Sequence, residues 1–213
     1  MAVMSVSAFK TEPGRLADHL AASEEAIGHL RRLGFAAIAS QVVAGTDVGT
    51  IATSINYENS AAYATGVQTI LADEGWQEFW ARAAAGGSAN QTEASLFADV
   101  DPDFQLDPNR ALGVIMATQW RAKPGRVADF AANVMASFPM IERMGGTPRA
   151  MQCVIGAHPM TSLVTTTFAD LDAYGAYTDT LQGDDEWQSF WADAMADPTA
   201  DMVRSGLYLN ISG

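Results

Sequence analysis

The sequence contains little cysteine and little histidine. Its 213 residues include one cysteine, Cys153, and three histidines. A single cysteine cannot form a disulfide within the chain, and this is typical of proteins from reducing compartments. We therefore expect a cytoplasmic protein. Because no H-x-x-x-H or C-x-x-C pair is present, the sequence predicts no metal site.

Basic residues and long apolar runs are also scarce. Lys and Arg number 12 against 25 Asp and Glu, which gives a formal net charge of −13. A negative field of this kind repels nucleic-acid phosphates and anionic lipid. No segment approaches the roughly 20 consecutive apolar residues that span a bilayer, and the first residues do not resemble a signal peptide. We expect neither a nucleic-acid nor a membrane partner.

The composition that remains is that of a folded domain without a common catalytic motif. Hydrophobic residues make up 48% of the chain and charged residues 17%, which is enough apolar surface for a core. The sequence contains no G-x-S-x-G, no G-x-x-x-x-G-K-[ST], and no G-x-G-x-x-G after a strand. The sequence therefore does not support a nucleotide-dependent enzyme or a hydrolase with a serine nucleophile.

The two halves of the chain repeat each other. Pro13-Gly14-Arg15 recurs as Pro124-Gly125-Arg126, and the segment 76–81 (WQEFWA) recurs as 187–192 (WQSFWA), both at an offset of 111 residues. The register holds without a gap through most of each half, which chance does not produce. We predict one domain at 1–100, a linker rich in Asp and Pro at 101–112, and a second domain at 113–213.

Each half shows the same order of expected elements, β-α-β-β-α-β. Alternating or β-rich segments indicate strands, and apolar residues at helical spacing indicate helices. In the first half we expect strands at 4–10, 36–44, 48–57 and 92–97, with helices at 15–33 and from 59 or 60 to about 83, the second restarting at Asp73. In the second half we expect strands at 113–120, 147–155, 160–168 and 203–211, with helices at 125–144 and 170–196.

This order is that of the ferredoxin-like unit, in which both helices cover one face of a four-stranded sheet. The other face of each sheet needs a partner, and the second copy supplies one. The predicted fold class is therefore α+β, a tandem repeat of two ferredoxin-like domains packed sheet to sheet. We expect a barrel-like arrangement with the helices outside.

The repeated motifs resemble those of a known superfamily. A first strand followed by Pro-Gly-Arg, an aromatic strand end at Tyr57 and Phe168, and Trp-Gln-x-Phe shortly after Asp73 and Asp184 are similar to the dimeric α+β barrel superfamily. The nearest branches are the NIPSNAP-like and antibiotic-biosynthesis-monooxygenase-like proteins. These motifs begin or pack helices, so the resemblance supports the fold strongly and a function weakly.

The resemblance implies a protein that binds a small apolar or aromatic metabolite. Members of the superfamily include cofactor-independent monooxygenases, lactone isomerases and haem-degrading enzymes. The leading hypothesis is a cofactor-independent monooxygenase or isomerase with a cavity between sheet and helices. The alternatives are a non-catalytic structural or interaction module and a haem-binding enzyme. A cavity of roughly 300 Å³ or more with convergent polar groups would favour ligand binding over the module.

Differences between the halves point to candidate ligand contacts in the second half. Gln119 and Trp120 replace a small and an aromatic residue of the first half. Arg149 replaces an isoleucine and could hold a carboxylate or enolate oxygen, although its place near a strand end favours an exposed arginine. His158 lies in a predicted hairpin, where an exposed turn histidine is favoured over a general base. Tyr174, at the start of a helix, could supply a phenol, although aromatic packing is the simpler interpretation.

The sequence predicts no cofactor and leaves haem open. Haem can be held by one histidine, and His19 on the first helix could point toward the sheet, although a partly exposed position is favoured. We expect either a monomeric pseudo-dimer or a homodimer of it.

Overall fold

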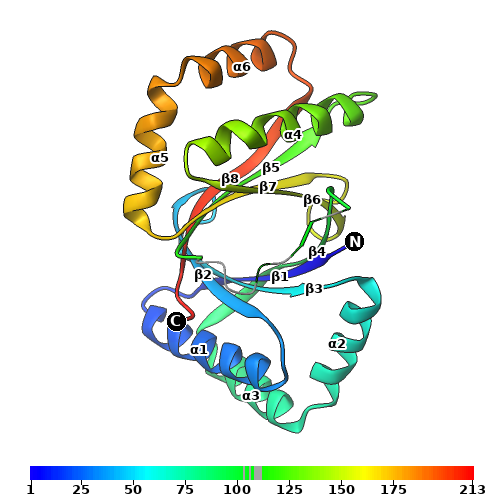
Figure 1. Ribbon diagram of the computed structural model, residues 1–213. Helices are drawn as coiled ribbons and strands as arrows, with labels where there is room; N and C mark the ends of the chain where they lie inside the picture. The colour runs from blue at the N-terminus through cyan, green and yellow to red at the C-terminus, as the bar shows by residue number, and fades with distance from the viewer. Residues whose placement is uncertain (103, 106, 108–111) are drawn as a thin grey trace.

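The fold is described from a computed structural model, which describes residues 1–102, 104–105, 107 and 112–213 (Figure 1). The elements of the first half are β1 (Val3–Thr11), α1 (Leu16–Arg32), β2 (Ala37–Gly45), β3 (Thr50–Tyr57), α2 (Ser60–Ala72), α3 (Glu74–Gly86) and β4 (Ala89–Asp99). Those of the second half are β5 (Val114–Ala122), α4 (Val127–Arg143), β6 (Thr147–Ile155), β7 (Ser162–Phe168), α5 (Leu171–Gly183), α6 (Asp185–Ala196) and β8 (Ala200–Asn210).

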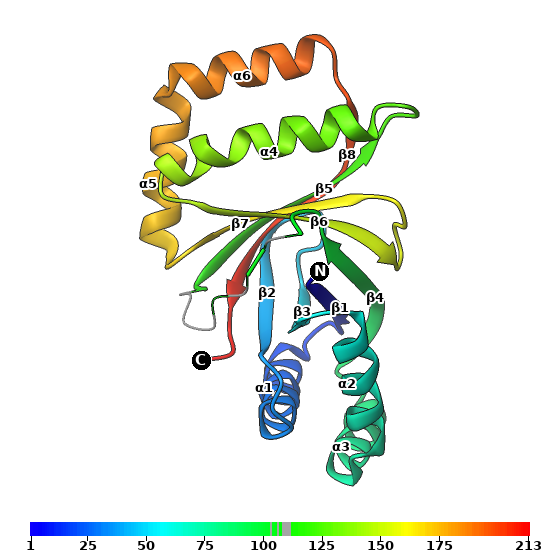
Figure 2. The same cartoon turned by 45° about the vertical axis from the view of Figure 1, so that its right-hand side comes forward.

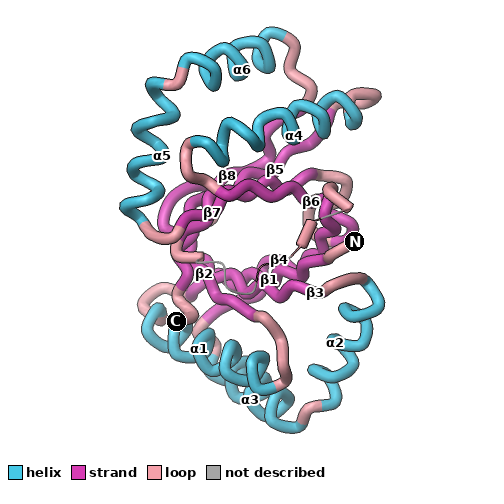
Figure 3. The backbone as a smooth tube through the Cα atoms, viewed as in Figure 1, coloured by secondary structure: helices cyan, strands magenta, loops and turns pink. Residues whose placement is uncertain are grey.

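The eight strands form one closed antiparallel barrel. Their order around the ring is β1-β3-β2-β8-β5-β7-β6-β4, which places the order 4-1-3-2 of a ferredoxin-like sheet in each half. The halves are joined edge to edge by the β2–β8 and β4–β6 pairs. Figure 3 shows this ring of strands in the middle of the molecule. Closure thus pairs both edges of each four-stranded sheet.

The helices lie outside the barrel on two opposite sides. Figure 2 shows α1, α2 and α3 on one side of the strands and α4, α5 and α6 on the other. The fold class expected from the sequence is confirmed. The predicted linker, 101–112, lies partly outside the described residues, and the domain boundaries at 100 and 113 stay a prediction.

The predicted second helix of the second half is wrong in one respect. The sequence indicates one helix at 170–196, whereas the structure has α5 and α6, with extended backbone at Asp184 between them. The carboxylate of Asp184 accepts a hydrogen bond from the Trp187 amide at 2.8 Å and forms an ion pair with Arg143. An Asp that caps a new helix ends the preceding one, because its side chain takes the place of the helical backbone partner.

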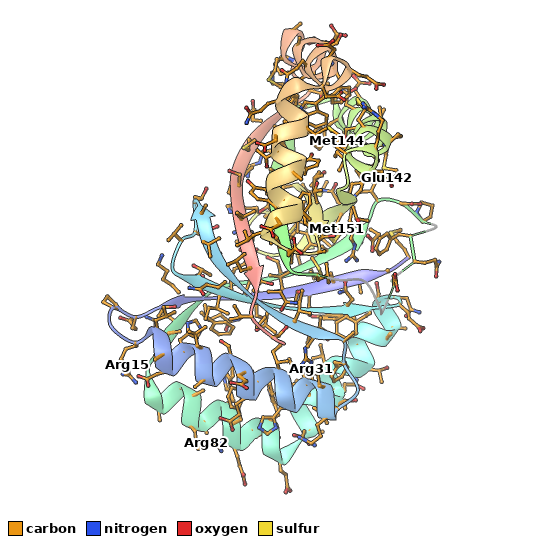
Figure 4. The ribbon with its side chains drawn as sticks, turned by 60° about the vertical axis from the view of Figure 1, so that its left-hand side comes forward. Arg15, Arg31, Arg82, Glu142, Met144 and Met151 are labelled. Atoms are coloured by element: carbon orange, nitrogen blue, oxygen red, sulfur yellow. The ribbon has the colours of Figure 1, made fainter. Side chains whose placement is uncertain are left out.

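The hydrophobic core is divided between the two halves. Each set of helices packs on the outer face of its own strands, through Ile27, Leu30 and Tyr57 in the first half and Met140, Phe168 and Trp187 in the second. Figure 4 shows the side chains and labels Met144 at the end of α4 and Met151 on β6, one of the barrel strands. Among the described residues, no helix combines the length and the apolar character that crossing a membrane requires.

Candidate functional site

The alternation of side chains along the strands creates two kinds of internal space. On β5, Met116, Thr118 and Trp120 lie on the face toward the helices, whereas Ala117 and Gln119 lie on the face toward the barrel interior. The barrel interior holds a cavity of about 390 Å³, called the lumen below. The space between α4, α5, α6 and the outer face of β5, β7 and β8 holds a second cavity of about 310 Å³, called the helix–sheet cavity.

The described residues that form the wall of the helix–sheet cavity include no charged side chain. The wall is built from apolar and aromatic residues with a few hydroxyl and amide groups: Met116, Thr118, Trp120, Phe130, Asn133, Val134, Ser137, Ile141, Val164, Thr166, Tyr177, Leu181, Trp187, Phe190, Trp191, Ala194, Met195, Thr199, Ala200 and Met202. Burying a net charge against such a wall would be costly, so an uncharged ligand fits it.

Trp120 is the residue of the sequence prediction that lies in this wall. Its ring centroid is 6.1 Å from that of Phe130 and 6.2 Å from that of Trp191. The indole N–H donates to the Thr118 hydroxyl at 2.8 Å, so it is already engaged. Trp120 therefore offers a ring face to the cavity.

Two other polar groups in the wall are buried and have no hydrogen-bond partner among the described residues. They are the Tyr177 hydroxyl and the Trp187 indole N–H, on side chains that are 2% and 8% exposed. Burial raises the pKa of Tyr177 to about 12, so this hydroxyl stays neutral at physiological pH. Buried donors are rarely left unpaired, and each unpaired one costs about 1–3 kcal/mol.

Sequence reasoning missed Tyr177, although a signal was present. At the offset of 111 residues, Tyr177 corresponds to Gly66, and Phe35 corresponds to Gly146. In the first half the Phe35 ring packs against Tyr57 and close to Gly66, whereas in the second half the ring that packs on Phe168 comes from Tyr177. The aromatic ring at this place thus comes from a different position of the repeat in each half, and only the ring of the second half carries a hydroxyl.

Three of the predicted residues line the lumen instead. Arg149 is buried and forms a two-point ion pair with Asp99, with N···O distances of 2.8 and 2.9 Å. It also donates to the Asn56 side chain at 2.8 Å, and its guanidinium lies 4.4 Å from the Phe104 ring centroid. The expectation of an exposed arginine is therefore wrong, because barrel closure brings β4 of the other half beside β6.

Gln119 belongs to a second polar network in the lumen. Its amide donates to the Thr161 hydroxyl at 2.6 Å and accepts from Arg204 Nε at 2.6 Å. Arg204 also donates to both carboxylate oxygens of Glu93, at 2.6 and 2.9 Å. Because β4 and β8 are four strands apart in the ring, this ion pair crosses the lumen.

Glu93 ionises more readily than usual despite its burial. Desolvation opposes the charged carboxylate, but hydrogen bonds from Arg204 and Ser95 outweigh it, so the pKa of Glu93 is lowered. The guanidinium of Arg204 is likewise desolvated, yet its pKa is raised by Glu93. The pair is therefore charged on both sides and neutral in sum.

The two remaining predicted residues have different surroundings. His158 is half-buried in the loop between β6 and β7 and lines the lumen. Tyr174 packs edge-on against Phe168, with ring centroids 5.5 Å apart, and lines neither the lumen nor the helix–sheet cavity. The structure thus brings Gln119, Arg149 and His158 to one cavity, Trp120 to another and Tyr174 to neither.

A smaller cavity of about 280 Å³ lies between α1, α3 and the strands of the first half, and His19 lines it. His19 is 5% exposed and its Nδ1 lies 2.7 Å from the Thr11 hydroxyl, so the expectation of a partly exposed side chain is wrong. Burial lowers the pKa of His19. His19 is buried because it occupies the position that Phe130 has in the second half, on the face of α1 that packs on the sheet.

The donor set of the helix–sheet cavity does not fit a haem. The described part of its wall contains no histidine and no cysteine, and its phenol, Tyr177, is neutral at physiological pH. Within the described ranges, no group of three or more His, Cys, Asp or Glu side chains is placed to hold a metal ion.

Comparison with known proteins gives structural relatives only. No protein-family model and no curated protein matches the sequence. A proposed monooxygenase from Fusobacterium nucleatum has a TM-score of 0.67 at 13% identity, covering 98% of this chain and 94% of its own. An anthrone oxidase-like protein has a TM-score of 0.58 at 11% identity, covering 98% and 91%.

A third solved structure, a haem-binding protein from Thermus thermophilus, has a TM-score of 0.57 at 8% identity, covering 98% of this chain and 90% of its own. Likeness at such low identity concerns the fold alone. Together with the closed eight-stranded ring, it shows that the chain adopts the dimeric α+β barrel fold, with both halves of the barrel in one polypeptide.

Proposed function

We propose that the chain binds an uncharged aromatic molecule in the helix–sheet cavity of the second half. The observation that carries this proposal is the pair of buried, unpaired donors, Tyr177 and Trp187, in the described wall of a 310 Å³ cavity. A ligand with a carbonyl or phenol oxygen would accept from these donors and remove their desolvation cost on binding. The rings of Trp120, Phe130 and Trp191 offer apolar contact to its planar body.

The size of the cavity favours binding over a purely structural module. Ligand pockets commonly measure about 300–1,000 Å³ and combine an apolar wall with a few placed polar groups. The helix–sheet cavity lies at the lower end of this range, which suits a ligand of two or three fused rings. A module whose halves merely complete a barrel would have no need for unpaired donors beside an open space.

The wall limits the chemistry that can follow binding. Its described residues include no Asp, Glu, His, Lys, Arg or Cys, so they offer no general base near neutral pH. Cofactor-independent oxygenation or isomerisation would then depend on the acidity of the ligand itself, while the wall orients the ligand and excludes water. The anthrone oxidase-like relative suggests a tricyclic ketone as the probe.

Calorimetric titration with 9-fluorenone, an uncharged tricyclic ketone, tests the proposal. We expect saturable binding with one site, weakened by about 2- to 10-fold in Tyr177→Phe, as one hydrogen bond predicts. Trp76→Phe, at the position equivalent to Trp187 in the first half, is the matched control and should bind as the unaltered chain does. Absence of binding, or equal weakening by both variants, would reject the site.

Oxygen uptake with anthrone then separates binding from catalysis. Anthrone and one O₂ give anthraquinone and one water, and the uncatalysed rate is measured without protein. Uptake above that rate, lost in Trp187→Phe but kept in Trp76→Phe, would support oxygenation in the helix–sheet cavity. Oxygen uptake at the uncatalysed rate, with fluorenone binding intact, would mean that the protein binds the ligand without catalysing its oxygenation.

A further inference from the structure

The lumen is larger than the helix–sheet cavity, and the proposed function does not use it. Its volume of about 390 Å³ lies within the range of ligand pockets. Small side chains keep this space open: Ala52 and Ala117 stand where the other half of the chain carries Leu163 and Val6.

Both arginines of the lumen are paired with carboxylates, and the described carboxylates around the lumen outnumber them. At one end Arg149 is held by Asp99, and near the other end Arg204 is held by Glu93 across the barrel. Arg149 also donates to Asn56, so most of the N–H groups of both guanidinium groups are already used. Asp47 and Asp107 also line the lumen, so a ligand that brought a further negative charge would find no free cation of the buried pairs to meet it.

Six hydroxyl groups in the lumen wall are free to bind a ligand. Within the described part of the chain, the hydroxyls that line the lumen and make no side-chain hydrogen bond are those of Ser40, Thr50, Ser54, Thr165, Ser205 and Tyr208. They come from β2, β3, β7 and β8, so they are spread over more than half of the ring rather than gathered at one point.

Tyr208 is the most prominent of these groups. Its ring lies along the wall beside Gly206, where an added Cβ would be 3.0 Å from the ring. Its counterpart in the first half is Phe97, which is fully buried and packs with Met4 and Met151. The second half thus adds one phenol to a wall whose apolar side chains are mostly aliphatic.

We infer that the lumen is a second binding site, which takes an uncharged aliphatic molecule bearing a hydroxyl or carbonyl oxygen. The aliphatic wall favours an alkyl chain over stacked rings, in contrast to the helix–sheet cavity. The free hydroxyls donate to or accept from the ligand oxygen, and the paired arginines together with the surplus carboxylates select against a ligand carboxylate. This site is independent of the proposed function, because it lies on the opposite face of the same strands.

Methionine methyl signals in NMR spectra can locate such a ligand. Met4 and Met151 line the lumen, whereas Met116 and Met195 line the helix–sheet cavity. On titration with 1-octanol we expect saturable shifts of the Met4 and Met151 methyl signals, and none for Met116 and Met195. Shifts confined to Met116 and Met195, or no shifts up to the solubility of octanol, would overturn the inference.

Variants that fill each cavity provide matched controls. Ala52→Leu with Ala117→Leu fills the lumen, and the first change copies the residue that the other half carries. We expect this variant to bind octanol at least tenfold more weakly and to bind 9-fluorenone unchanged. Ala194→Leu, in the wall of the helix–sheet cavity, should show the reverse pattern. Octanol binding that survives lumen filling would contradict the inference.

The ligand class and the role of Tyr208 are tested separately. Octanoate should bind at least tenfold more weakly than octanol, and equal or tighter binding of octanoate would overturn the selection against a ligand carboxylate. If the filled variant does not fold, Tyr208→Phe takes its place. This variant should weaken octanol binding roughly threefold to tenfold. An unchanged affinity would contradict a hydrogen bond between the Tyr208 hydroxyl and the ligand.

Discussion

At the scale of single residues, the unpaired Tyr177 hydroxyl has a consequence for stability as well as for binding. An unsatisfied buried donor costs free energy in the unliganded protein. We expect Tyr177→Phe to raise the free energy of unfolding by about 1 kcal/mol, measured by urea denaturation. Tyr174→Phe, on the same helix but half-buried, is the control and should stay within about 0.5 kcal/mol. A loss of stability in Tyr177→Phe would show that its hydroxyl has a protein partner.

The buried ion pair of Arg149 and Asp99 makes a different prediction at this scale. Arg149→Ile alone leaves a buried carboxylate without its partner and should cost about 3–5 kcal/mol. The counterparts of these two residues in the repeat are Ile38 and Asn210. The double variant Arg149→Ile with Asp99→Asn copies them and should recover a large part of the loss in urea denaturation. A double variant as unstable as the single one would contradict this account.

The sequence identified some of these residues but not their partners. The differences between the halves pointed to Gln119 and Arg149, both of which are buried among polar groups. Asp99 was missed because its contact with Arg149 forms across the β4–β6 junction, which exists only once the barrel closes. Arg204 was missed because it lies opposite Gln119 on β8, and the register of the β5–β8 pair joins two ends of the half that are far apart in the chain. Tyr177 could have been found by the same comparison, since it stands opposite Gly66.

At the scale of elements, the break between α5 and α6 depends on Asp184. Its carboxylate accepts from the Trp187 amide and pairs with Arg143, and these hydrogen bonds lower the pKa of Asp184. The same arrangement recurs in the first half between Asp73, Arg32 and the amide of Trp76. The break therefore orients the helix that carries the Trp187 indole toward the cavity.

We expect Asp184→Ala to lower the melting temperature by about 2–4 °C and to weaken fluorenone binding, since the helix start loses its cap. Asp184→Asn keeps an acceptor for the amide and should lower the melting temperature less. Differential scanning calorimetry of both variants gives the comparison, and equal effects would assign the stabilisation to charge rather than to the cap.

Most elements could be predicted from local patterns, because strand alternation and helical spacing repeat in both halves. Strand ends extended further than expected, for example in β4, where pairing with the neighbouring strands continues beyond the alternating segment. The pairs β2–β8 and β4–β6 join residues far apart in the chain, so their registers depend on barrel closure and not on any local signal.

At the scale of the whole molecule, Glu93 and Arg204 show that a duplicated chain can carry opposite charges at equivalent positions of its two halves. They are 111 residues apart and so occupy equivalent positions in the two halves. A homodimer of identical halves would place like charges at this point, whereas a single chain can place opposite charges there. The cross-lumen ion pair therefore joins the halves in a way that only the fused barrel allows.

The pair also predicts how stability depends on pH. Because the folded-state pKa of Glu93 lies below its ordinary value of 4.5, its contribution is present above pH 4.5 and is lost as the pH falls through the folded-state value. We expect the free energy of unfolding to fall more steeply on acidification below pH 4.5 in the unaltered chain than in Glu93→Gln. Parallel pH profiles in urea denaturation would show that the pair contributes nothing.

The central claim, that the helix–sheet cavity binds an uncharged aromatic molecule through its unpaired donors, is tested most directly by the indole N–H signals in a ¹⁵N–¹H spectrum. The chain has five tryptophans, so each indole can be followed separately. On addition of 9-fluorenone, we expect a saturable downfield shift of the Trp187 signal, because its N–H gains an acceptor, and no change in the Trp76 signal. An unmoved Trp187 signal, or equal shifts of Trp187 and Trp76, would contradict it.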